Sequence, residues 1–201
     1  MKRSMLAGAI ALCAMACGTA SGAGDPVAGK TKSFDCEACH SAANLAMNPM
    51  WPSLNGQHAD YLVKQMQDFQ TAQRLQGVMQ QMLAPLDQTT IADIAAYYAS
   101  LPLPPPDEVD PELAARGKRL YTQGAADVAS CASCHGANGH SEAAGGFSIL
   151  AGQQSRYILN QLLAYKYGDR TNDPASVMRN IAEKLDEAEL EAVAAYVASL
   201  K

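Results

Sequence analysis

Positive charge, histidine and long apolar runs are all scarce in this sequence. Its 201 residues include 15 lysines and arginines against 20 aspartates and glutamates, a formal net charge of −5, and 4 histidines. An acidic chain is poorly suited to the phosphate backbone, so we expect no nucleic-acid partner. Beyond the N-terminus no apolar run is long enough to span a bilayer. The composition predicts one or two small domains.

The one sustained apolar run lies at the N-terminus. Lys2 and Arg3 precede "MLAGAIALCAMAC", and small residues follow it. About 13 apolar residues are too few for a membrane helix, so residues 1–23 are predicted to be a secretory signal cleaved near Ala23. Cys17 leaves a second interpretation open, because "AMAC" resembles the box at which bacterial lipoproteins are cleaved and acylated. Either interpretation predicts export of the mature chain.

The rest of the chain repeats one pattern. "CEACH" at 36–40 returns as "CASCH" at 131–135, and "LNGQHADYLVKQ" at 54–65 returns as "LAGQQSRYILNQ" at 150–161. This repetition predicts two similar domains. The offset of 96 that aligns the second pair matches Gly56 with Gly152, Tyr61 with Tyr157 and Arg74 with Arg170.

A proline-rich segment, "LPLPPPDEVDP", separates the two halves. Proline fixes φ and removes the backbone donor, which predicts an extended spacer. We place the N-terminal domain at residues 24–101, the linker at 102–111 and the C-terminal domain at 112–201.

Within each half the apolar periodicity is helical. Asp87 and Asp186 are suited to cap the helix that ends each half. No alternating strand pattern of useful length appears, so the predicted fold class is all-α. Further helices are predicted at about 58–70, 112–123 and 155–166.

The two CxxCH runs carry the chemistry. Zinc needs about four nitrogen or sulfur ligands, but each half offers one CxxC and no second pair at suitable spacing. A thioredoxin-like dithiol expects a βαβ setting, which the pattern lacks. A His directly after the second Cys is instead the signature of c-type haem attachment. We predict two covalently bound haem c groups, attached through Cys36, Cys39, Cys131 and Cys134, with iron bound by His40 and His135.

Methionine narrows the choice of the second axial ligand. After Met82 the sequence holds a single methionine, Met178, just ahead of the last helix. The offset of 99 that aligns the C-terminal helices places Met79 at the matching position. We predict that Met178 lies in a loop and that Met79 and Met178 bind iron. Met66 and Met82 are predicted to fill gaps in the core.

The other polar residues of the repeat have weaker assignments. His58 maps to Gln154, so its role is predicted not to be shared, and His140 is predicted to lie in an exposed loop. Two interpretations stay open for the paired tyrosines and arginines. Either they reach haem propionates, or the tyrosines pack in the core and the arginines are solvated; these are Tyr61, Tyr157, Arg74 and Arg170.

A His/Met pair fills both axial positions of a haem iron and leaves no site for oxygen, peroxide or substrate. The thioether favours ferrous iron and raises the reduction potential. These features predict an electron-transfer protein, not an enzyme. One alternative stays open: a dihaem peroxidase-like enzyme or a cytochrome subunit of a dehydrogenase, in which one haem would have a displaceable sixth ligand.

The paired CxxCH runs, the paired "GQ...Y...Q" segments, the two pre-helical methionines and the proline-rich linker resemble the dihaem cytochrome c4 family. The resemblance covers the mature chain and implies two tandem class I cytochrome c domains, each wrapped around one haem. It implies a bacterial periplasmic location, often at the membrane surface, with electrons passing from a quinol-oxidising complex toward a terminal oxidase. It also implies that a backbone carbonyl near Pro52, and near Ser148 where proline is typical, accepts the N–H of the iron-binding histidine.

Overall fold

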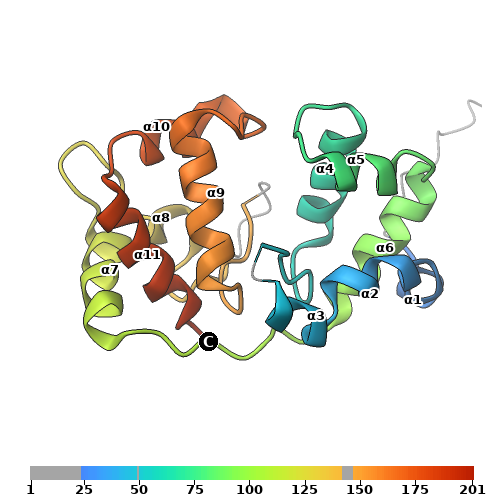
Figure 1. Cartoon of the computed structure of the whole chain (residues 1–201), viewed down its shortest axis with the longest axis horizontal. Helices are drawn as coiled ribbons and strands as arrows, with labels where there is room; N and C mark the ends of the chain where they lie inside the picture. The colour runs from blue at the N-terminus through green and yellow to red at the C-terminus, as the bar shows by residue number, and fades with distance from the viewer. Residues whose placement is uncertain (1–23, 49, 142–146) are drawn as a thin grey trace, which may run out of the picture.

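The chain forms two helical bodies side by side, joined by a linker (Figure 1). A computed structural model describes residues 24–48, 50–141 and 147–201, and these contain helices and no strand. The all-α prediction is therefore confirmed. The predicted signal segment and Cys17 lie outside the described residues. Within them, no helix has the length and apolarity needed to cross a bilayer.

The first body contains α1 (Pro26–Lys32), α2 (Phe34–His40), α3 (Ala42–Met47), α4 (Ala59–Gln70), α5 (Gly77–Leu83) and α6 (Gln88–Ser100). The second contains α7 (Pro111–Gln123), α8 (Ala132–His135), α9 (Ser155–Tyr167), a 3₁₀ turn (Pro174–Ser176), α10 (Val177–Ala182) and α11 (Glu187–Ala198). The helices predicted at 58–70, 112–123 and 155–166 are confirmed as α4, α7 and α9.

Both predicted caps form. The Asp87 carboxylate accepts the Thr90 N–H at 2.7 Å. The Asp186 carboxylate accepts the Glu189 N–H at 2.8 Å. The Glu189 carboxylate in turn accepts the Asp186 N–H at 2.9 Å, which completes a capping box. Each cap satisfies an amide that the helix itself leaves free, and therefore fixes where the last long helix of each body begins.

The first and last helices of each body cross at a glycine. A Cβ at Gly29 of α1 would lie 1.9 Å from the Asp93 carbonyl oxygen of α6. A Cβ at Gly117 of α7 would lie 1.9 Å from the Ala192 carbonyl oxygen of α11. Only glycine allows so close an approach, and the equal distances indicate that the two bodies are built alike.

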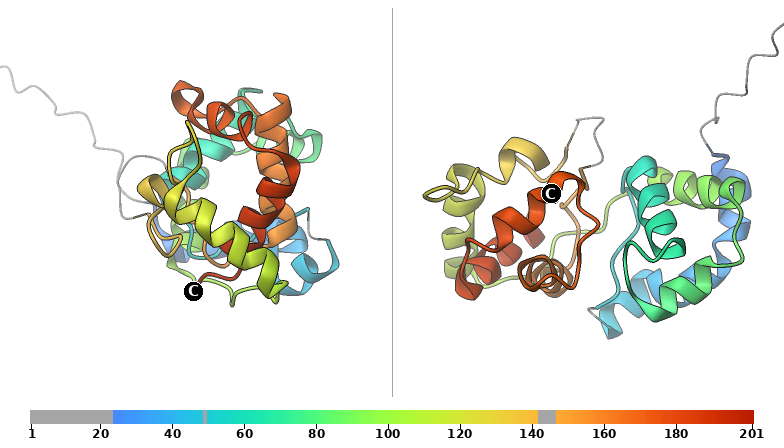
Figure 2. Two further views of the ribbon diagram at one scale, coloured as in Figure 1. Left: turned by 90° about the vertical axis from the view of Figure 1, so that its left-hand side faces the viewer. Right: turned by 90° about the horizontal axis from the view of Figure 1, so that it is seen from above.

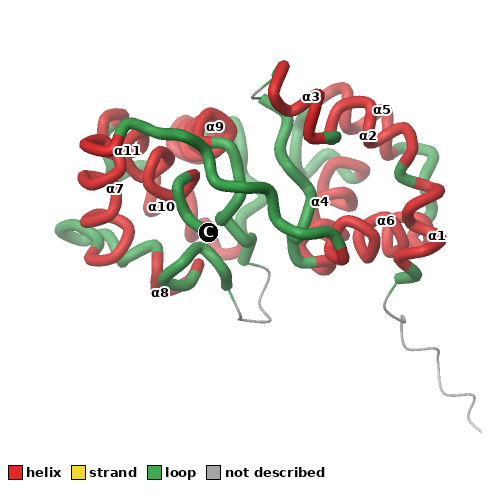
Figure 3. Tube along the Cα trace, turned by 90° about the horizontal axis from the view of Figure 1, so that it is seen from below, coloured by secondary structure: helices red, strands yellow, loops and turns green. Residues whose placement is uncertain are grey.

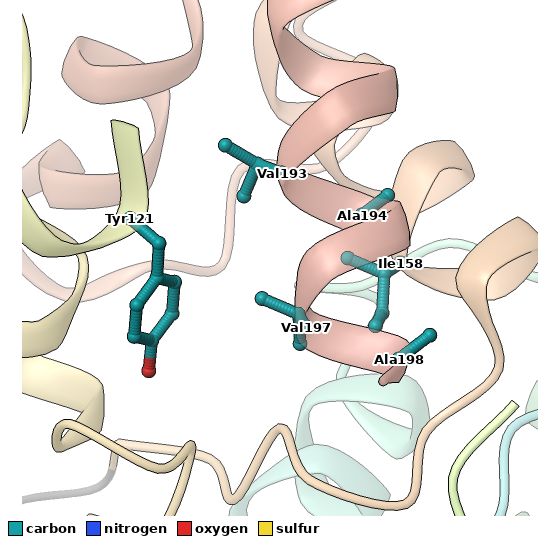
Figure 4. Packing of buried hydrophobic residues seen from close by; sticks show 6 residues of the cluster. All are labelled: Tyr121, Ile158, Val193, Ala194, Val197 and Ala198. Carbon is teal, nitrogen blue, oxygen red and sulfur yellow. The ribbon is translucent and has the colours of Figure 1, made fainter. Parts of the chain in front are cut away.

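Apolar side chains around this crossing form the core of each body. In the second body, Tyr121 of α7 faces α11, from which Val193 and Val197 point toward it (Figure 4). Cys131 packs against this cluster, and Cys36 packs against the corresponding cluster around Tyr98 in the first body. Full burial of a side chain such as Val193 or Val197 contributes about 1.5–3 kcal/mol to the stability of the fold. The CxxCH segments are thus fixed against the core.

The linker runs along one side of both bodies from α6 to α7 (Figures 2 and 3). Leu103 lies against Gly56 of the first body, and Pro104 lies against Gly152 of the second. Both glycines have positive φ values, 70° and 72°, which a side chain would strain. Helix α7 begins at Pro111, with Asp110 as its cap, because proline fits the first helical position.

Candidate functional site

The cysteines of each CxxCH run lie three residues apart around one short helical segment. Cys36 and Cys39 belong to α2, while Cys131 caps α8 and Cys134 lies within it. All four are half-buried free thiols. Burial raises the pKa of the Cys36 thiol, and it raises the pKa of Cys131 to about 11. Reactive dithiols need a lowered pKa, so these thiols are poorly suited to disulfide exchange.

The histidine that follows each pair is buried and held by one ring nitrogen. His40 Nδ1 lies 2.8 Å from the Pro52 carbonyl oxygen, and His135 Nδ1 lies 3.0 Å from that of Ser148. Burial lowers the pKa of both imidazoles, which favours the neutral ring. A neutral ring that donates from Nδ1 carries its lone pair on Nε2, the tautomer that binds a metal. Ser148 therefore supplies the same acceptor as Pro52 without proline.

These donors fit a covalently attached haem. Within the described part of the chain, each site combines two thiols outside any disulfide, a buried imidazole held only through Nδ1, and an adjacent apolar cluster. In the first body the buried Tyr98 hydroxyl has no hydrogen-bond partner among the residues that the structure describes. No group of three His, Cys, Asp or Glu side chains suited to a metal ion occurs in the described part of the chain.

The methionines predicted as axial ligands lie in short helices. Met79 is in the first turn of α5 and Met178 in the first turn of α10, and both are half-buried. The prediction that Met178 lies in a loop is therefore wrong. Met66 packs against the first core cluster as predicted, whereas Met82 is 42% exposed and does not fill the core.

The segment that carries Met178 is anchored by an ion pair. The buried Asp173 carboxylate accepts from Arg179 Nε at 2.8 Å and from the Arg179 backbone N–H at 3.1 Å. Arg179 also donates to the Ser176 hydroxyl at 2.8 Å. These bonds hold Ala175 and Ser176 at φ values of 51° and 59°, which non-glycine residues seldom adopt. The backbone before Met178 is therefore fixed by its own side chains.

A polar network joins the two bodies on the sides where α4 and α9 face each other (Figure 1). Its two guanidinium groups, those of Arg74 in the first body and Arg170 in the second, each bond a glutamine of their own body and a glutamine and a tyrosine of the other body. Arg74 donates to Gln65, Tyr157 and Gln161, and Arg170 donates to Gln161, Gln65, Tyr61 and Asn172, at 2.8–3.2 Å. Arg170 is 6% exposed, so the open interpretation of a solvated charge is wrong for this residue.

The network is rich in positive charge. Among the described residues, neither Arg74 nor Arg170 forms an ion pair with a carboxylate. Burial alone would raise the pKa of the Tyr61 hydroxyl, but the charges of Arg170 and Arg74 outweigh it and lower that pKa. A buried cluster of this kind favours an anionic group nearby.

Further bonds between the bodies come from the repeated GQ segments. The Gln57 side chain bonds the backbone of Ile149 twice, and the Gln153 side chain bonds the backbone of Ser53 twice. Sequence reasoning quoted this repeat but gave its glutamines no role. The repeat itself pointed to a shared role, because Gln57 and Gln153 each follow a glycine and lie 96 residues apart, the offset that aligns these segments.

The residues after these glutamines also form matching bonds. His58 Nε2 lies 2.7 Å from the Ser141 carbonyl oxygen, and Gln154 Nε2 donates to that of Leu45 at 3.0 Å. The prediction that the role of His58 is not shared is wrong, since a glutamine amide replaces the imidazole as donor. His140 lies in a loop as predicted, but it is half-buried.

Comparisons with known proteins agree with this geometry. Residues 114–201 match the family model described as Cytochrome c. A cytochrome c4 from Thiocapsa roseopersicina is 39% identical over 88% of this chain and 93% of its own. A "Thiosulfate dehydrogenase electron acceptor" from Stutzerimonas stutzeri is 35% identical over 82% of this chain and 78% of its own. The crystal structure of reduced recombinant cytochrome c4 from Pseudomonas stutzeri has 36% identity and a TM-score of 0.84, and covers 89% of this chain and all of that one.

Proposed function

The chain belongs to the cytochrome c4 family, and on that premise we propose that it relays electrons between exported redox partners through two His/Met-ligated haems. It carries two covalently bound haem c groups, as an electron carrier of this family does. In the proposal, the first haem is held by Cys36, Cys39, His40 and Met79, and the second by Cys131, Cys134, His135 and Met178.

One observation carries this proposal: the same histidine arrangement occurs twice. Both His40 and His135 are buried, neutral, one residue after a CxxC pair, and hydrogen-bonded through Nδ1 to a backbone carbonyl. Holding the ring by Nδ1 fixes its plane and keeps Nε2 directed at one ligand. Two such sites in one chain support a two-centre electron carrier, and the sixth ligand of each haem is what separates this function from the dihaem peroxidase-like alternative.

The protein's part in electron transfer is to keep each site unchanged between oxidation states. The haem supplies an iron that gains or loses one electron. The buried imidazole and a thioether from α5 or α10 give the same ligand set in both states, which keeps the reorganisation small, and the thioether raises the potential. The buried core around Tyr98 and Tyr121 limits access of water.

The two guanidinium groups of the polar network support a further part of the proposal. A haem carries carboxylate groups, and Arg74 and Arg170 are buried or half-buried cations without a carboxylate partner among the described residues. We propose that they neutralise haem carboxylates, the first of the two interpretations that the sequence leaves open for these arginines.

The location and partners follow from the predicted export signal and the family. We propose a bacterial periplasmic protein, at the membrane surface if Cys17 is acylated, that takes electrons from a quinol-oxidising complex and delivers them toward a terminal oxidase. Relatives named as thiosulfate dehydrogenase electron acceptors favour a second donor class, a periplasmic dehydrogenase. Reduction of the purified protein by each donor, followed at the haem absorbance, separates the two.

The ligand assignment is tested on the mature protein as exported. Mass spectrometry is expected to give two haem additions and the cleavage site, and to show a lipid if Cys17 is acylated. The ferric spectrum is expected to show thioether charge-transfer intensity at the red edge of the visible range for both haems. A high-spin haem would contradict the carrier function and favour the peroxidase-like alternative.

A further inference from the structure

In each domain, one peptide group is hydrogen-bonded at both of its ends. The peptide between Pro52 and Ser53 accepts His40 Nδ1–H on its carbonyl oxygen at 2.8 Å. Its N–H, on Ser53, donates to Gln153 Oε1 at 3.0 Å. Gln153 belongs to the other domain. A single amide therefore lies between the iron-binding histidine of the first domain and a side chain of the second.

The second domain repeats this arrangement with the partners exchanged. The peptide between Ser148 and Ile149 accepts His135 Nδ1–H on its carbonyl oxygen at 3.0 Å. Its N–H, on Ile149, donates to Gln57 Oε1 at 2.8 Å. Gln57 comes from the first domain, so each histidine is connected through one peptide to a glutamine of the opposite domain.

The contacts fix the orientation of both glutamine amides. Gln153 Nε2 donates to the Ser53 carbonyl oxygen at 3.0 Å, and Gln57 Nε2 donates to that of Ile149 at 2.8 Å. Each Oε1 also accepts the backbone N–H of the next residue in its own chain segment, at 3.1 Å in both domains. A backbone N–H can only donate, so the atom that faces it must be Oε1. Reversing either amide would leave donors facing donors and acceptors facing acceptors.

A hydrogen bond to one end of a peptide changes the strength of the bond at its other end. An acceptor on the N–H increases the negative charge on the carbonyl oxygen, and hydrogen bonds in such a chain polarise one another. A stronger carbonyl acceptor draws the Nδ1 proton and makes the imidazole a more basic ligand. A more basic ligand stabilises ferric iron and lowers the reduction potential.

We propose that Gln57 and Gln153 are positioning residues that lower the reduction potential of the haem in the opposite domain. Gln153 acts on the first haem through the Pro52–Ser53 peptide, and Gln57 acts on the second haem through the Ser148–Ile149 peptide. The relative position of the domains thus becomes a determinant of each potential. The inference rests on the proposed function, because it takes His40 and His135 to be iron ligands.

The chain supplies a matched control. Gln154 also donates an amide hydrogen bond across the interface, but to the Leu45 carbonyl oxygen, which is not part of either histidine-bonded peptide. If the glutamines only hold the domains together, losing Gln154 should act like losing Gln153. If they act through the peptides, only Gln57 and Gln153 should move a potential.

The test measures both haem potentials of the complete haem-loaded protein. Gln153→Leu is expected to raise the potential of the first haem and leave the second unchanged, and Gln57→Leu is expected to do the reverse. Gln154→Leu is expected to move neither. Gln153→Met, which keeps the unbranched length, provides a second variant if leucine disturbs the packing. Equal shifts at both haems, a shift confined to the glutamine's own domain, or no shift would overturn the inference.

A second readout does not depend on electron transfer. In NMR spectra of the reduced protein, the Nδ1 proton of His40 is expected to move upfield in Gln153→Leu, because its hydrogen bond weakens, while that of His135 stays in place. Covalent attachment and a low-spin spectrum, recorded for every variant, test the proposed function separately. If these are retained and the crossed pattern is absent, the inference alone fails.

Discussion

In the second domain the ion pair between Arg179 and the buried Asp173 carboxylate, together with the Ser176 hydroxyl, holds the segment that carries Met178. In the first domain the equivalent of Arg179 is Gln80, and Met79 is tied by its backbone N–H to Gln76 Oε1 at 3.0 Å. Apolar neighbours of Met79 are also open to solvent, with Leu75 69% and Val78 59% exposed.

The domains are nevertheless closely alike on the histidine side. Both have the Nδ1 bond to a carbonyl, the same glycine crossing and the same exchange of glutamine bonds. The difference shows that the two domains share the geometry around the histidine but differ in how the segment of the proposed methionine ligand is supported. We therefore expect Met79 to be the more easily displaced of the two methionines.

The largest effect on stability should come from substituting the glycines at the helix crossings, and it should be similar in the two domains if they are built alike. Gly117→Ala places a Cβ 1.9 Å from the Ala192 carbonyl oxygen, and Gly29→Ala does the same at Asp93. Each change should destabilise its own domain by roughly 3 kcal/mol, the usual upper range for overpacking. Guanidinium unfolding followed by NMR signals of each domain measures this. A loss shared equally by both domains would mean that they unfold as one unit.

Removal of either methionine should lower the reduction potential of the haem in its own domain and leave the other haem unchanged. Met178→Ala is expected to lower the potential of the second haem, on the order of 0.1 V or more within the roughly 0.8 V that axial ligands span, while the haem stays attached. Met79→Ala should do the same to the first haem. Redox titration of each variant decides this, and an unchanged potential would show that the ligand choice is wrong.

Loss of the ion pair beside Met178 should make the two methionines more alike in how easily they are displaced. Asp173→Asn removes the charge that Arg179 pairs with, at a cost of about 1 kcal/mol for a partly exposed pair. The second methionine should then be displaced by added imidazole at concentrations nearer those that displace the first. Gln80→Arg, in a domain without the matching carboxylate, serves as a control and should leave the first haem's titration unchanged.

The two domains should also differ, by a smaller amount, in how their stability depends on pH. The Asp93 carboxylate accepts from Lys32 at 2.6 Å and from the Asp25 N–H at 2.7 Å, and these bonds hold its pKa below the ordinary value. The matching residue of the second domain is Ala192. A lowered pKa gives stability that is present above about pH 4, the unfolded value, and lost as the pH falls through the folded value.

The first domain should therefore lose stability on acidification below about pH 4 by a route that the second lacks. Asp93→Asn should flatten this pH dependence, as measured by thermal unfolding between pH 3 and pH 6. An equal flattening in the second domain would contradict the assignment.

Sequence periodicity predicted the long helices because each presents an apolar face over three or more turns. It missed α1, α2, α3, α5, α8 and α10, which span four to seven residues and offer too few repeats to read. Two of these short helices, α5 and α10, carry Met79 and Met178, which explains why Met178 was expected in a loop. Their burial depends on tertiary packing that local sequence does not encode.

The candidate site divides in the same way. The proposed attachment residues lie in a short local motif, CxxC followed directly by His, so the sequence alone could predict them. The roles of Gln57 and Gln153 depend on contacts between residues about a hundred positions apart, and no local pattern shows which backbone they meet. Met82 was expected in the core from its residue type, but its surroundings leave it 42% exposed.

The exchanged bonds between the domains have the symmetry of an isologous dimer, in which residue i meets residue j and j meets i. The linker that crosses Gly56 and Gly152 converts such a dimer into one chain and holds each half at a high effective concentration near the other. Pairing is then secured by the covalent connection as well as by the contacts. One copy can accumulate changes, as around Met79, without losing its partner, which a dimer of identical subunits does not allow.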